Sequence, residues 1–326
     1  MAHDAWPFPR ANASARRIVR LKVRDGERWS RTVGALGAAA WRRLVTLRYA
    51  IVGCGRTGSL LAHDLAALGV RHLVLVDPDR LERHNLGEMA GVGETDLGRP
   101  KAEALARHLA GTFPWVRPEP VVASVTARRS LQALLSCDVL CCCADRDSAR
   151  LATAILAVLY LRPLLDIGTG VLIPRGAAQP VMGADVRLLL PGEGCLLCVG
   201  GLVAPEEARR NLQSPQVEGS GRGGEWRRER AGSLRSLNQV AVGLALRLWE
   251  ELVAERRREG AWLRLTFDPE GRPALQVLPR QPDPNCPLCR YLAGGDALRG
   301  QAVQAVLGEQ GWDTLGSHLG AAEGNK

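Results

Sequence analysis

The 326-residue sequence is short of aromatic residues, with only 8 Trp, 3 Tyr and 3 Phe. We therefore expect a core built mostly from Leu, Val and Ala. The N-terminus, as far as Arg20, lacks the apolar stretch of a signal peptide. The longest apolar run, Ala154–Leu161, ends at Arg162, far short of the ~20 residues that span a bilayer. These absences predict a cytoplasmic protein without a membrane-spanning segment.

The composition excludes several other classes. With 46% hydrophobic and 24% charged residues, the chain is typical of a globular protein of one large or two ordinary domains. Its 36 glycines follow no period, which excludes collagen and low-complexity chains. The net charge of +9 suggests nucleic acid as a partner, but the basic residues are dispersed and lack interleaved aromatics, so we expect no nucleic-acid binding. Nine cysteines do not suit a simple disulfide framework.

Short apolar segments alternate with helical segments in the first half of the chain. The predicted strands are Tyr49–Gly53, His72–Asp77, Pro120–Val125, Cys137–Cys143 and Pro163–Ile167, and the predicted helices are Thr57–Leu68, Pro100–Leu109 and Asp147–Leu161. Strands buried on both faces read as continuous apolar runs, as these do. The alternation predicts an α/β fold with a doubly wound, Rossmann-like, mostly parallel sheet.

Outside that region the pattern is different. We expect a strand at Ala15–Val23, a helix at Arg28–Leu47, two or three short strands in Val171–Leu190, a long polar surface loop at Ala204–Ala231, a helix at Leu234–Arg258, and a hairpin of Ala261–Asp268 with Pro273–Leu278. The final arginines of the long helix would suit its negative end. The later strands predict an antiparallel C-terminal extension of the sheet.

Gly53-Cys54-Gly55-Arg56-Thr57-Gly58 fits the Gly-x-Gly-x-x-Gly pattern between a predicted strand and a predicted helix. The glycines allow a tight turn and let phosphates approach backbone N–H groups at the helix N-terminus. Asp77 ends the next strand, about 20 residues further on, where a carboxylate accepts hydrogen bonds from a ribose. The pattern predicts an adenine nucleotide without distinguishing ATP from NAD.

Further motifs resemble the ubiquitin-activating-enzyme family, which includes the bacterial ThiF- and MoeB-type adenylyltransferases. The matching segments are Arg28-Trp29-Ser30-Arg31, the run from Asp77-Pro78-Asp79 to Asn85-Leu86, Gly98-Arg99-Pro100-Lys101-Ala102, Cys137-Asp138-Val139 through Ala144-Asp145, and the expected glycine turn Gly168-Thr169-Gly170. They occur in the family's order and at its intervals, over roughly residues 28–290.

The resemblance implies a role for each matching residue. The set that would bind the nucleotide is Gly53, Gly55, Gly58, Asp77, Asp79, Asn85 and Lys101. Within it, Asp77 would bind the ribose, whereas Asn85 and Lys101 would contact the triphosphate of ATP. Asp145 would hold Mg²⁺, and Arg31 would reach the triphosphate of a neighbouring subunit, because these enzymes are usually homodimers. Lysine, arginine and Mg²⁺ offset the charge that builds up when a carboxylate attacks the α-phosphate, so Arg31, Lys101 and Asp145 are the expected catalytic residues.

Two positions depart from the family's pattern. Glu88 stands where the family has an arginine that touches phosphate, and a carboxylate there would repel ATP unless it faces away. Either another arginine substitutes, or the handling of the nucleotide is altered. The candidate substitutes are Arg83, Arg99 and Arg146. Arg146 itself replaces the family's usual asparagine after Asp145.

The cysteines divide into two groups. Cys195, Cys198, Cys286 and Cys289 form two Cys-x-x-Cys pairs, and four thiolates make a closed tetrahedral zinc site. The resembled family has the same long-range pairing, which implies a structural Zn²⁺ that ties the C-terminal segment to the domain. The remaining cysteines are expected only to pack: Cys54, Cys137, Cys141, Cys142 and Cys143.

The sequence lacks the nucleophile that thioester-forming members carry before the long helix, because no cysteine occurs between Cys198 and Cys286. We therefore expect no cysteine thioester step. Two alternatives remain open. The protein hands an acyl-adenylate to another nucleophile, or a loop serine, best placed at Ser220, takes the acyl group as an oxyester.

The expected function is ATP-dependent adenylation of the C-terminal carboxylate of a ubiquitin-like protein or peptide with a glycine tail, in a bacterial ubiquitin-like conjugation pathway that can include a conjugating-enzyme-like partner. A binding-only family member is the alternative that Glu88 and the absent cysteine favour. An NAD-dependent oxidoreductase is a weaker alternative, because no hydride-transfer residues are evident. The expected organisation is an extension at 1–27, an adenylation domain at 28–292 that contains a crossover-type loop at 203–232, and a tail at 293–326.

Overall fold

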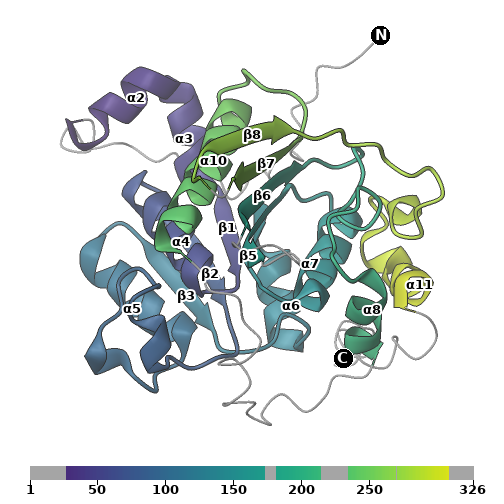
Figure 1. Cartoon of the computed structure of the whole chain (residues 1–326), viewed down its shortest axis with the longest axis horizontal. Helices are drawn as coiled ribbons and strands as arrows, with labels where there is room; N and C mark the ends of the chain where they lie inside the picture. The colour runs from purple at the N-terminus through teal and green to yellow at the C-terminus, as the bar shows by residue number, and fades with distance from the viewer. Residues whose placement is uncertain (1–26, 173–180, 214–233, 269, 308–326) are drawn as a thin grey trace, which may run out of the picture.

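The computed structural model describes residues 27–172, 181–213, 234–268 and 270–307 (Figure 1). In this part of the chain, eight strands form one sheet in the order β3-β2-β1-β4-β5-β6-β7-β8. The strands are β1 (Arg48–Val52), β2 (His72–Val76), β3 (Arg117–Val121), β4 (Val139–Cys142), β5 (Leu164–Leu172), β6 (Val181–Leu189), β7 (Ala261–Phe267) and β8 (Pro273–Val277). The first five are parallel and the last three antiparallel, which confirms the predicted fold class.

Helices cover both faces of the sheet. They are α2 (Ser30–Leu36), α3 (Ala38–Thr46), α4 (Arg56–Ala67), α5 (Lys101–Thr112), α6 (Arg128–Leu135), α7 (Asp147–Leu159), α8 (Pro205–Gln213), α10 (Arg235–Val253) and α11 (Gly295–Leu307), with short 3-10 turns η2 (Arg83–Asn85), η3 (Glu94–Asp96) and η4 (Cys289–Tyr291). Ile51 of β1 belongs to the core shared with α3, α4, α5 and α10, whereas its neighbour Ala50 belongs to the core shared with α6, α7, α8 and α11. Successive side chains of the strand thus pack on opposite faces of the sheet, as strand geometry requires.

The third strand was predicted wrongly at Pro120–Val125. The observed strand β3 starts at Arg117, pairs with β2 from His72↔Arg117 to Val76↔Val121, and forms the edge of the sheet. Pro118 and Pro120 lack N–H groups, which an edge strand tolerates on its outer side. Helix α6 after it was not predicted.

Two predicted helices and one predicted loop also need correction. The expected helix Arg28–Leu47 is two helices, because Gly37 with a φ of 86° ends α2 and precedes α3. The expected helix Leu234–Arg258 ends at Val253, so its final arginines follow the helix. The expected loop Ala204–Ala231 begins with the helix α8, and its later part, including Ser220, lies outside the described residues.

Two predicted strand regions differ as well. Gly168-Thr169-Gly170 is not a turn but part of β5, which continues to Leu172. The region Val171–Leu190 contains the end of β5 and one long strand, β6, rather than several short strands. The strand expected at Ala15–Val23 lies outside the described residues. The expected hairpin is present as β7 and β8.

Helix α11 belongs to the same packed body. Ala302, Val303 and Val306 are buried in the core shared with α7 and α8, although they fall in the segment expected as a tail. The domain boundaries stay a prediction. None of the described helices is long and apolar enough to cross a membrane.

Tryptophans close the C-terminal end of α4. Trp29, Trp41 and Trp115 donate their indole N–H groups to its last carbonyl oxygens. The acceptors are Ala67, Leu68 and Ala66, at 2.8, 2.9 and 2.8 Å, respectively. The last carbonyls of a helix lack the usual partner four residues on, and the indoles supply donors to them; the carbonyl of Ala66 also accepts the backbone N–H of Gly69 at 3.0 Å. The same contacts fix α2 and α3 against the helix that follows the glycine loop.

Candidate functional site

The glycine loop joins β1 to α4, and the space around each of its three glycines differs. Gly53 has a φ of +89°, and a Cβ there would lie 2.9 Å from the backbone nitrogen of Ala144. A Cβ on Gly58 would lie 1.8 Å from the carbonyl oxygen of Gly53. At Gly55, by contrast, no atom of the described residues lies within 4 Å of the Cβ position. The backbone is therefore tightly packed around the first and third glycines and open at the second, where a phosphate can approach the N-terminus of α4.

Asp77 follows β2 and lies against this loop. Its Oδ2 accepts a hydrogen bond from the backbone N–H of Cys54 at 2.7 Å, and its Oδ1 accepts one from Asp79 at 2.8 Å. The residue is only 5% exposed. Burial raises the pKa of Asp77 to about 6, although Lys101 opposes the shift. The carboxylate is held rigidly in the position predicted for a ribose-binding acid.

Lys101, the first residue of α5, lies among carboxylates. Its Nζ is 2.8 Å from Oδ2 of Asp79, and its backbone N–H donates to the carbonyl of Asp79 at 2.9 Å. Burial alone would lower the pKa of Lys101, but Asp77, Asp79 and Asp145 together raise it above its ordinary value. The lysine is therefore a firmly charged ammonium beside the glycine loop, as a triphosphate ligand must be.

Asn85 has a structural hydrogen bond of its own. Its Oδ1 accepts the backbone N–H of Glu82 at 2.9 Å and closes the turn η2, and the residue is 9% exposed. Only its amide Nδ2 remains to donate to a phosphate.

Glu88 follows Asn85 in the same segment. Its Oε2 is buried, and no hydrogen-bond partner for it occurs among the residues described. The guanidinium of Arg235, at the start of α10, donates to the backbone carbonyls of Glu88 and Met89, both at 3.2 Å. The sequence analysis did not single out Arg235. The one feature that could have indicated this contact is its position at the start of the long helix.

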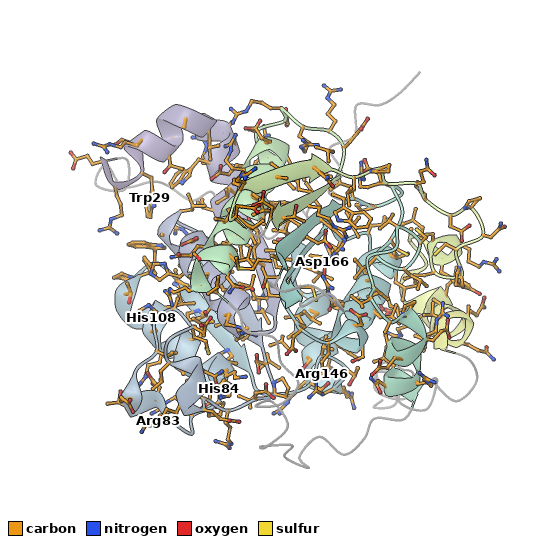
Figure 2. All side chains as sticks on the ribbon, in the orientation of Figure 1. Trp29, Arg83, His84, His108, Arg146 and Asp166 are labelled. Carbon is orange, nitrogen blue, oxygen red and sulfur yellow. The ribbon has the colours of Figure 1, made fainter. Side chains whose placement is uncertain are left out.

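The three arginines predicted as substitutes lie elsewhere. Arg83 forms an ion pair with Glu94 at 3.1 Å, and Arg99 forms one with Asp96 at 3.7 Å. Arg146 precedes α7, and Figure 2 shows it well separated from Arg83. Neither of the first two is brought to the glycine loop by the described contacts.

Arg31 and Asp145, the other two predicted catalytic residues, are both exposed. Asp145 is exposed just before α7, and it is near enough to Lys101 to raise the pKa of the lysine. Arg31 is exposed on α2, which packs against α3 (Figure 1). No contact among the described residues brings Arg31 to the glycine loop, and its role stays a prediction.

A buried amide joins three elements behind the glycine loop. Oδ1 of Asn238, in the first turn of α10, accepts hydrogen bonds from Thr57 of the loop at 2.9 Å and from Thr169 of β5 at 2.7 Å. Asn238 is fully buried. Sequence reasoning missed this contact, which fixes the loop to β5 and α10.

The four cysteines of the two Cys-x-x-Cys pairs converge. The Sγ atoms of Cys195 and Cys286 are 3.6 Å apart, those of Cys198 and Cys289 are 3.7 Å apart, and all four lie within 4.8 Å of one another. A tetrahedral Zn²⁺ with Zn–S bonds of about 2.3 Å needs sulfur atoms about 3.8 Å apart. The set fits the predicted structural zinc, which would join the segment after β6 to the segment after β8.

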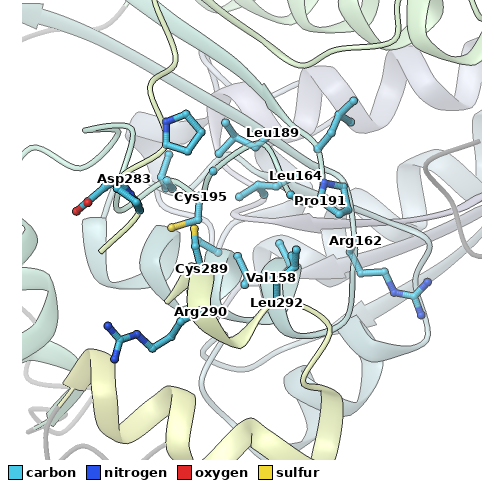
Figure 3. Close-up of a pocket in the computed structure, with 18 residues that line it drawn as sticks. Val158, Arg162, Leu164, Leu189, Pro191, Cys195, Asp283, Cys289, Arg290 and Leu292 are labelled. Atoms are coloured by element: carbon cyan, nitrogen blue, oxygen red, sulfur yellow. The ribbon is translucent and has the colours of Figure 1, made fainter. Parts of the chain in front are cut away.

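An apolar cavity of about 250 Å³ lies beside the four cysteines (Figure 3). Leu164, Leu189 and Leu292 line it together with Cys195. It lies on the α7 side of the sheet. None of the predicted nucleotide-binding residues lines it.

The other five cysteines pack, as predicted. Cys54, Cys137, Cys141 and Cys142 are buried, and Cys143 is half-buried. Burial raises the pKa of Cys137 to about 11 and that of Cys142 to about 12. Thiols with such pKa values are poor nucleophiles at neutral pH.

The glycine loop, Asp77 and Lys101 meet at the carboxyl ends of β1 and β2, beside the point where the strand order reverses between β1 and β4. This is the ligand position of doubly wound sheets, so the fold and site define an α/β protein of the nucleotide-binding, Rossmann-like class. The ThiF family model matches residues 29–298. The chain belongs to the ThiF family.

Relatives and solved structures agree with this assignment. The chain is 35% identical over 175 residues to the SAMP-activating enzyme E1 of Haloferax volcanii, covering 53% of this chain and 61% of that one. It is 29% identical over 130 residues to the sulfur carrier protein adenylyltransferase of Thermus thermophilus, covering 40% and 48%. The chain thus matches less than two thirds of the length of these relatives. The structure of E. coli MccB with ATP shares the fold, with a TM-score of 0.61, 18% identity and coverage of 80% and 74%.

Proposed function

We propose that the protein uses MgATP to adenylate the C-terminal carboxylate of a ubiquitin-like protein or sulfur carrier. The observation that carries the proposal is the convergence of Asp77, Asp79 and Lys101 on the open side of the glycine loop, at 2.7–2.9 Å from their partners. The names of the relatives, a SAMP-activating enzyme and a sulfur carrier protein adenylyltransferase, support the substrate class.

Each residue has a defined task in this reaction. The open backbone at Gly55 receives the phosphates, Asp77 accepts hydrogen bonds from the ribose, and Lys101 exchanges Asp79 for the triphosphate. A carboxylate oxygen of the substrate attacks the α-phosphorus, the bond to the bridging oxygen breaks, and pyrophosphate leaves. Acyl-AMP remains.

Asp145 is the residue that would hold Mg²⁺, since it is an exposed carboxylate at the end of β4 and beside Lys101. When bound, the ion supplies charge neutralisation for the leaving pyrophosphate. The ammonium of Lys101, which lies near Asp145, adds a further positive charge for the same purpose.

The acyl group leaves without a cysteine thioester in this chain. No cysteine separates Cys198 from Cys286, and the buried thiols elsewhere are poor nucleophiles. A nucleophile of another protein attacks the acyl carbon, the bond to the phosphate oxygen breaks, and AMP leaves, in a bacterial ubiquitin-like conjugation or sulfur-carrier pathway in the cytoplasm. A conjugating-enzyme-like protein is one such recipient. Ser220 is the alternative acceptor within the chain.

The working unit is a homodimer in this proposal. Arg31 is exposed on α2, and Figure 1 shows α2 at a corner of the molecule, from which its side chain would extend to a neighbouring subunit. The partner's triphosphate is its target.

ATP–pyrophosphate exchange tests the reaction. The wild-type protein should exchange pyrophosphate into ATP only when a cognate carrier with a glycine tail is present. Lys101→Met should lower the rate about 10²–10³-fold, the usual effect of removing one charge-stabilising donor. The control is Arg272→Ala, which changes an exposed arginine beside β8 and should behave as the wild type. No exchange with any carrier encoded near the gene would contradict the proposal.

A second candidate, a binding-only member, is favoured by the half-buried Glu88, which stands where the family has an arginine and whose Oε2 is buried with no hydrogen-bond partner among the described residues. Such a protein would bind a carrier but no nucleotide. Calorimetric titration with MgATP separates the two, because only the enzyme gives a binding isotherm.

A further inference from the structure

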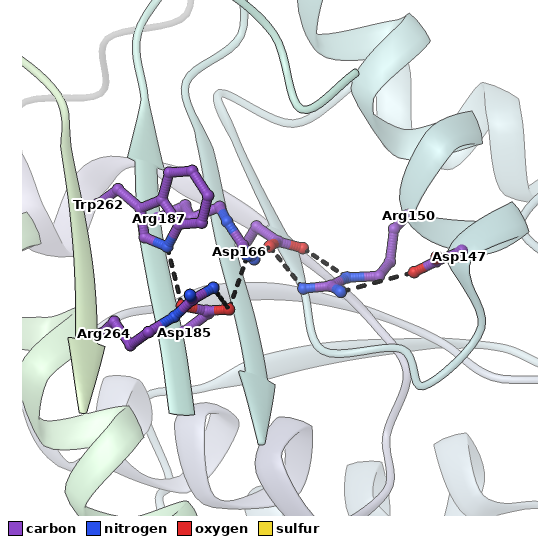
Figure 4. Close-up of polar contacts among 7 residues, drawn as sticks. All are labelled: Asp147, Arg150, Asp166, Asp185, Arg187, Trp262 and Arg264. Atoms are coloured by element: carbon purple, nitrogen blue, oxygen red, sulfur yellow. Dashed lines mark hydrogen bonds and ion pairs between the residues drawn. The ribbon is translucent and has the colours of Figure 1, made fainter. Parts of the chain in front are cut away.

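A chain of alternating charges runs from α7 across β5 and β6 to β7 (Figure 4). Its members are Asp147, Arg150, Asp166, Arg187, Asp185 and Arg264. It starts in the first turn of α7, two residues after Asp145, and ends on β7. Three carboxylates and three guanidinium groups alternate, so the chain is neutral as a whole.

The centre of this chain is buried and strongly hydrogen-bonded. The guanidinium of Arg150 donates to both oxygens of Asp166, from Nε at 3.0 Å and from Nη2 at 2.6 Å. Arg187 donates to the same carboxylate at 2.9 Å. The side chain of Asp166 is fully buried, and that of Arg150 is 9% exposed. A Cβ on Gly168 would lie 2.9 Å from Arg150, so β5 leaves room for the arginine.

Stability alone does not account for such an arrangement. Buried ion pairs seldom stabilise a fold more than apolar side chains of the same volume would. Their strength is that they fix a geometry, because each group has only one set of partners. The geometry fixed here is that of the N-terminus of α7 relative to β5.

Asp147 extends this fixed geometry to a second element. One of its oxygens lies 3.7 Å from Nη1 of Arg150, and the other accepts the backbone N–H of Ala204 at 2.7 Å. Ala204 immediately precedes α8, where Pro205 offers no N–H group. Arg235, at the start of α10, holds the carbonyls of Glu88 and Met89. The segment from α8 to α10 is thus attached at both ends to residues beside the nucleotide site.

We propose that Asp147 is a positioning residue. It joins Ala204, the residue before α8, to the segment that contains Asp145 and precedes α7, and the hydrogen bonds between Arg150 and Asp166 hold α7 in place. Asp147 holds the residue before α8 and belongs to the first turn of the helix that follows Asp145, so its contacts set where both stand. In this proposal a carrier that binds against α8 and MgATP at Asp145 strengthen each other's binding, and linkage makes the two effects equal. The inference rests on the proposed function and names a residue that is not itself the proposed Mg²⁺ ligand.

Two variants of Asp147 separate its contacts. Asp147→Asn keeps an acceptor for Ala204 but removes the charge that faces Arg150, whereas Asp147→Ala removes both. The control is Asp296→Asn, which changes an acid in the first turn of α11 whose side chain is 75% exposed. Each protein is titrated with ATP at several Mg²⁺ concentrations, without carrier and with it.

For Asp147→Ala we expect the Mg²⁺ concentration at half-saturation to rise about tenfold, the usual effect of losing a group that orients a metal ligand. We also expect the carrier to strengthen MgATP binding in the wild type and in Asp296→Asn, but not in Asp147→Ala. Asp147→Asn should fall between them. A purely structural role would lower the Tm of the variants and leave these ratios unchanged.

The outcomes are distinguishable. If the wild type binds MgATP and Asp147→Ala shows the same Mg²⁺ dependence and the same carrier effect, the coupling is wrong and the proposed function stands. If the wild type binds no nucleotide, the proposed function is wrong and the coupling falls with it. If Asp147→Ala does not fold, Asp147→Asn decides by the same two measurements.

Discussion

Lys101 Nζ lies 2.8 Å from Asp79 Oδ2, and the backbones of the two residues are hydrogen-bonded as well. The ammonium is thus held at the glycine loop by a carboxylate that a triphosphate can replace. The site is assembled before ATP arrives, which limits the entropy lost on binding. The predictions below concern this site and the elements that hold it.

Mixing two inactive variants tests whether Arg31 acts on a neighbouring subunit. Arg31→Ala and Lys101→Met should each lose pyrophosphate exchange. Random dimers of the two should recover roughly a quarter of the wild-type rate, because half of the dimers then contain one site with both residues. The measurement is exchange after co-refolding or co-expression. No recovery in mixtures shown to contain mixed dimers would mean that Arg31 and Lys101 of the same subunit serve one site, and would contradict the proposal.

The affinity for ATP should depend on the ionisation of Asp77. Its pKa of about 6 lies above the ordinary 3.8, and ribose hydroxyls donate better to the ionised form. The Kd for MgATP should therefore rise as the pH falls through about 6. Asp77→Asn should bind more weakly and lose this part of the pH dependence. Calorimetry from pH 8 to pH 5 in about half-unit steps measures both effects.

The same pKa shift affects stability with the opposite trend. The folded protein holds the Asp77 proton more tightly than the unfolded chain does, so the group contributes stability at low pH, and this contribution is lost as the pH rises through about 6. Comparing urea denaturation of the wild type and Asp77→Asn at pH 5 and pH 7.5 isolates this contribution. An identical difference at both pH values would exclude it.

The four converging cysteines predict one zinc ion per chain. Cys289→Ser should lower the zinc content and the Tm, because the ion joins the segments after β6 and β8 and supports the adjoining α11. Cys143→Ser, outside the cluster, should keep the zinc. Metal analysis of the purified proteins gives the answer. Equal zinc contents in the two variants would contradict the assignment.

Trp29→Phe should destabilise the fold by about 1 kcal/mol, since it removes the hydrogen bond to the C-terminal end of α4 but keeps most of the ring packing. Trp115→Phe removes an equivalent bond to the neighbouring carbonyl and should have a similar effect. Urea denaturation measures the change in the free energy of unfolding. A Trp29→Phe variant as stable as the wild type would mean that water replaces the indole.

The local part of the site was predictable, and the long-range part was not. The glycine loop, Asp77 and Lys101 follow directly from strand and helix ends, and the parallel sheet brings those ends together. The bond between Thr57 and Asn238 joins residues 181 positions apart, and no periodicity points to it. The contact of Arg235 with the Glu88 backbone depends on where α10 starts. The sequence before α10 is mostly polar, so the first residue of the helix cannot be read from it.

The predicted bounds of two elements, β3 and α8, were wrong for physical reasons. The strand expected at Pro120–Val125 is instead β3 at Arg117–Val121, which contains two prolines, and only its edge position tolerates them. Helix α8 has a strongly polar composition and is held by its contacts with α7, so it was expected as a loop. Propensity alone does not detect such packing.

The tryptophans that close α4 also give the protein an optical reporter. Trp29 lies 5.3 Å from Trp41 and 5.0 Å from Trp115, measured between ring centroids. They are gathered at one end of α4, whereas the glycine loop lies at the other end, about 18 Å away along a helix of 12 residues. Their ultraviolet emission, added to that of the five other tryptophans of the chain, therefore reports on the packing at the end of α4 remote from the glycine loop. Loosening of this end on denaturation can be followed in the unmodified protein, with no dye attached.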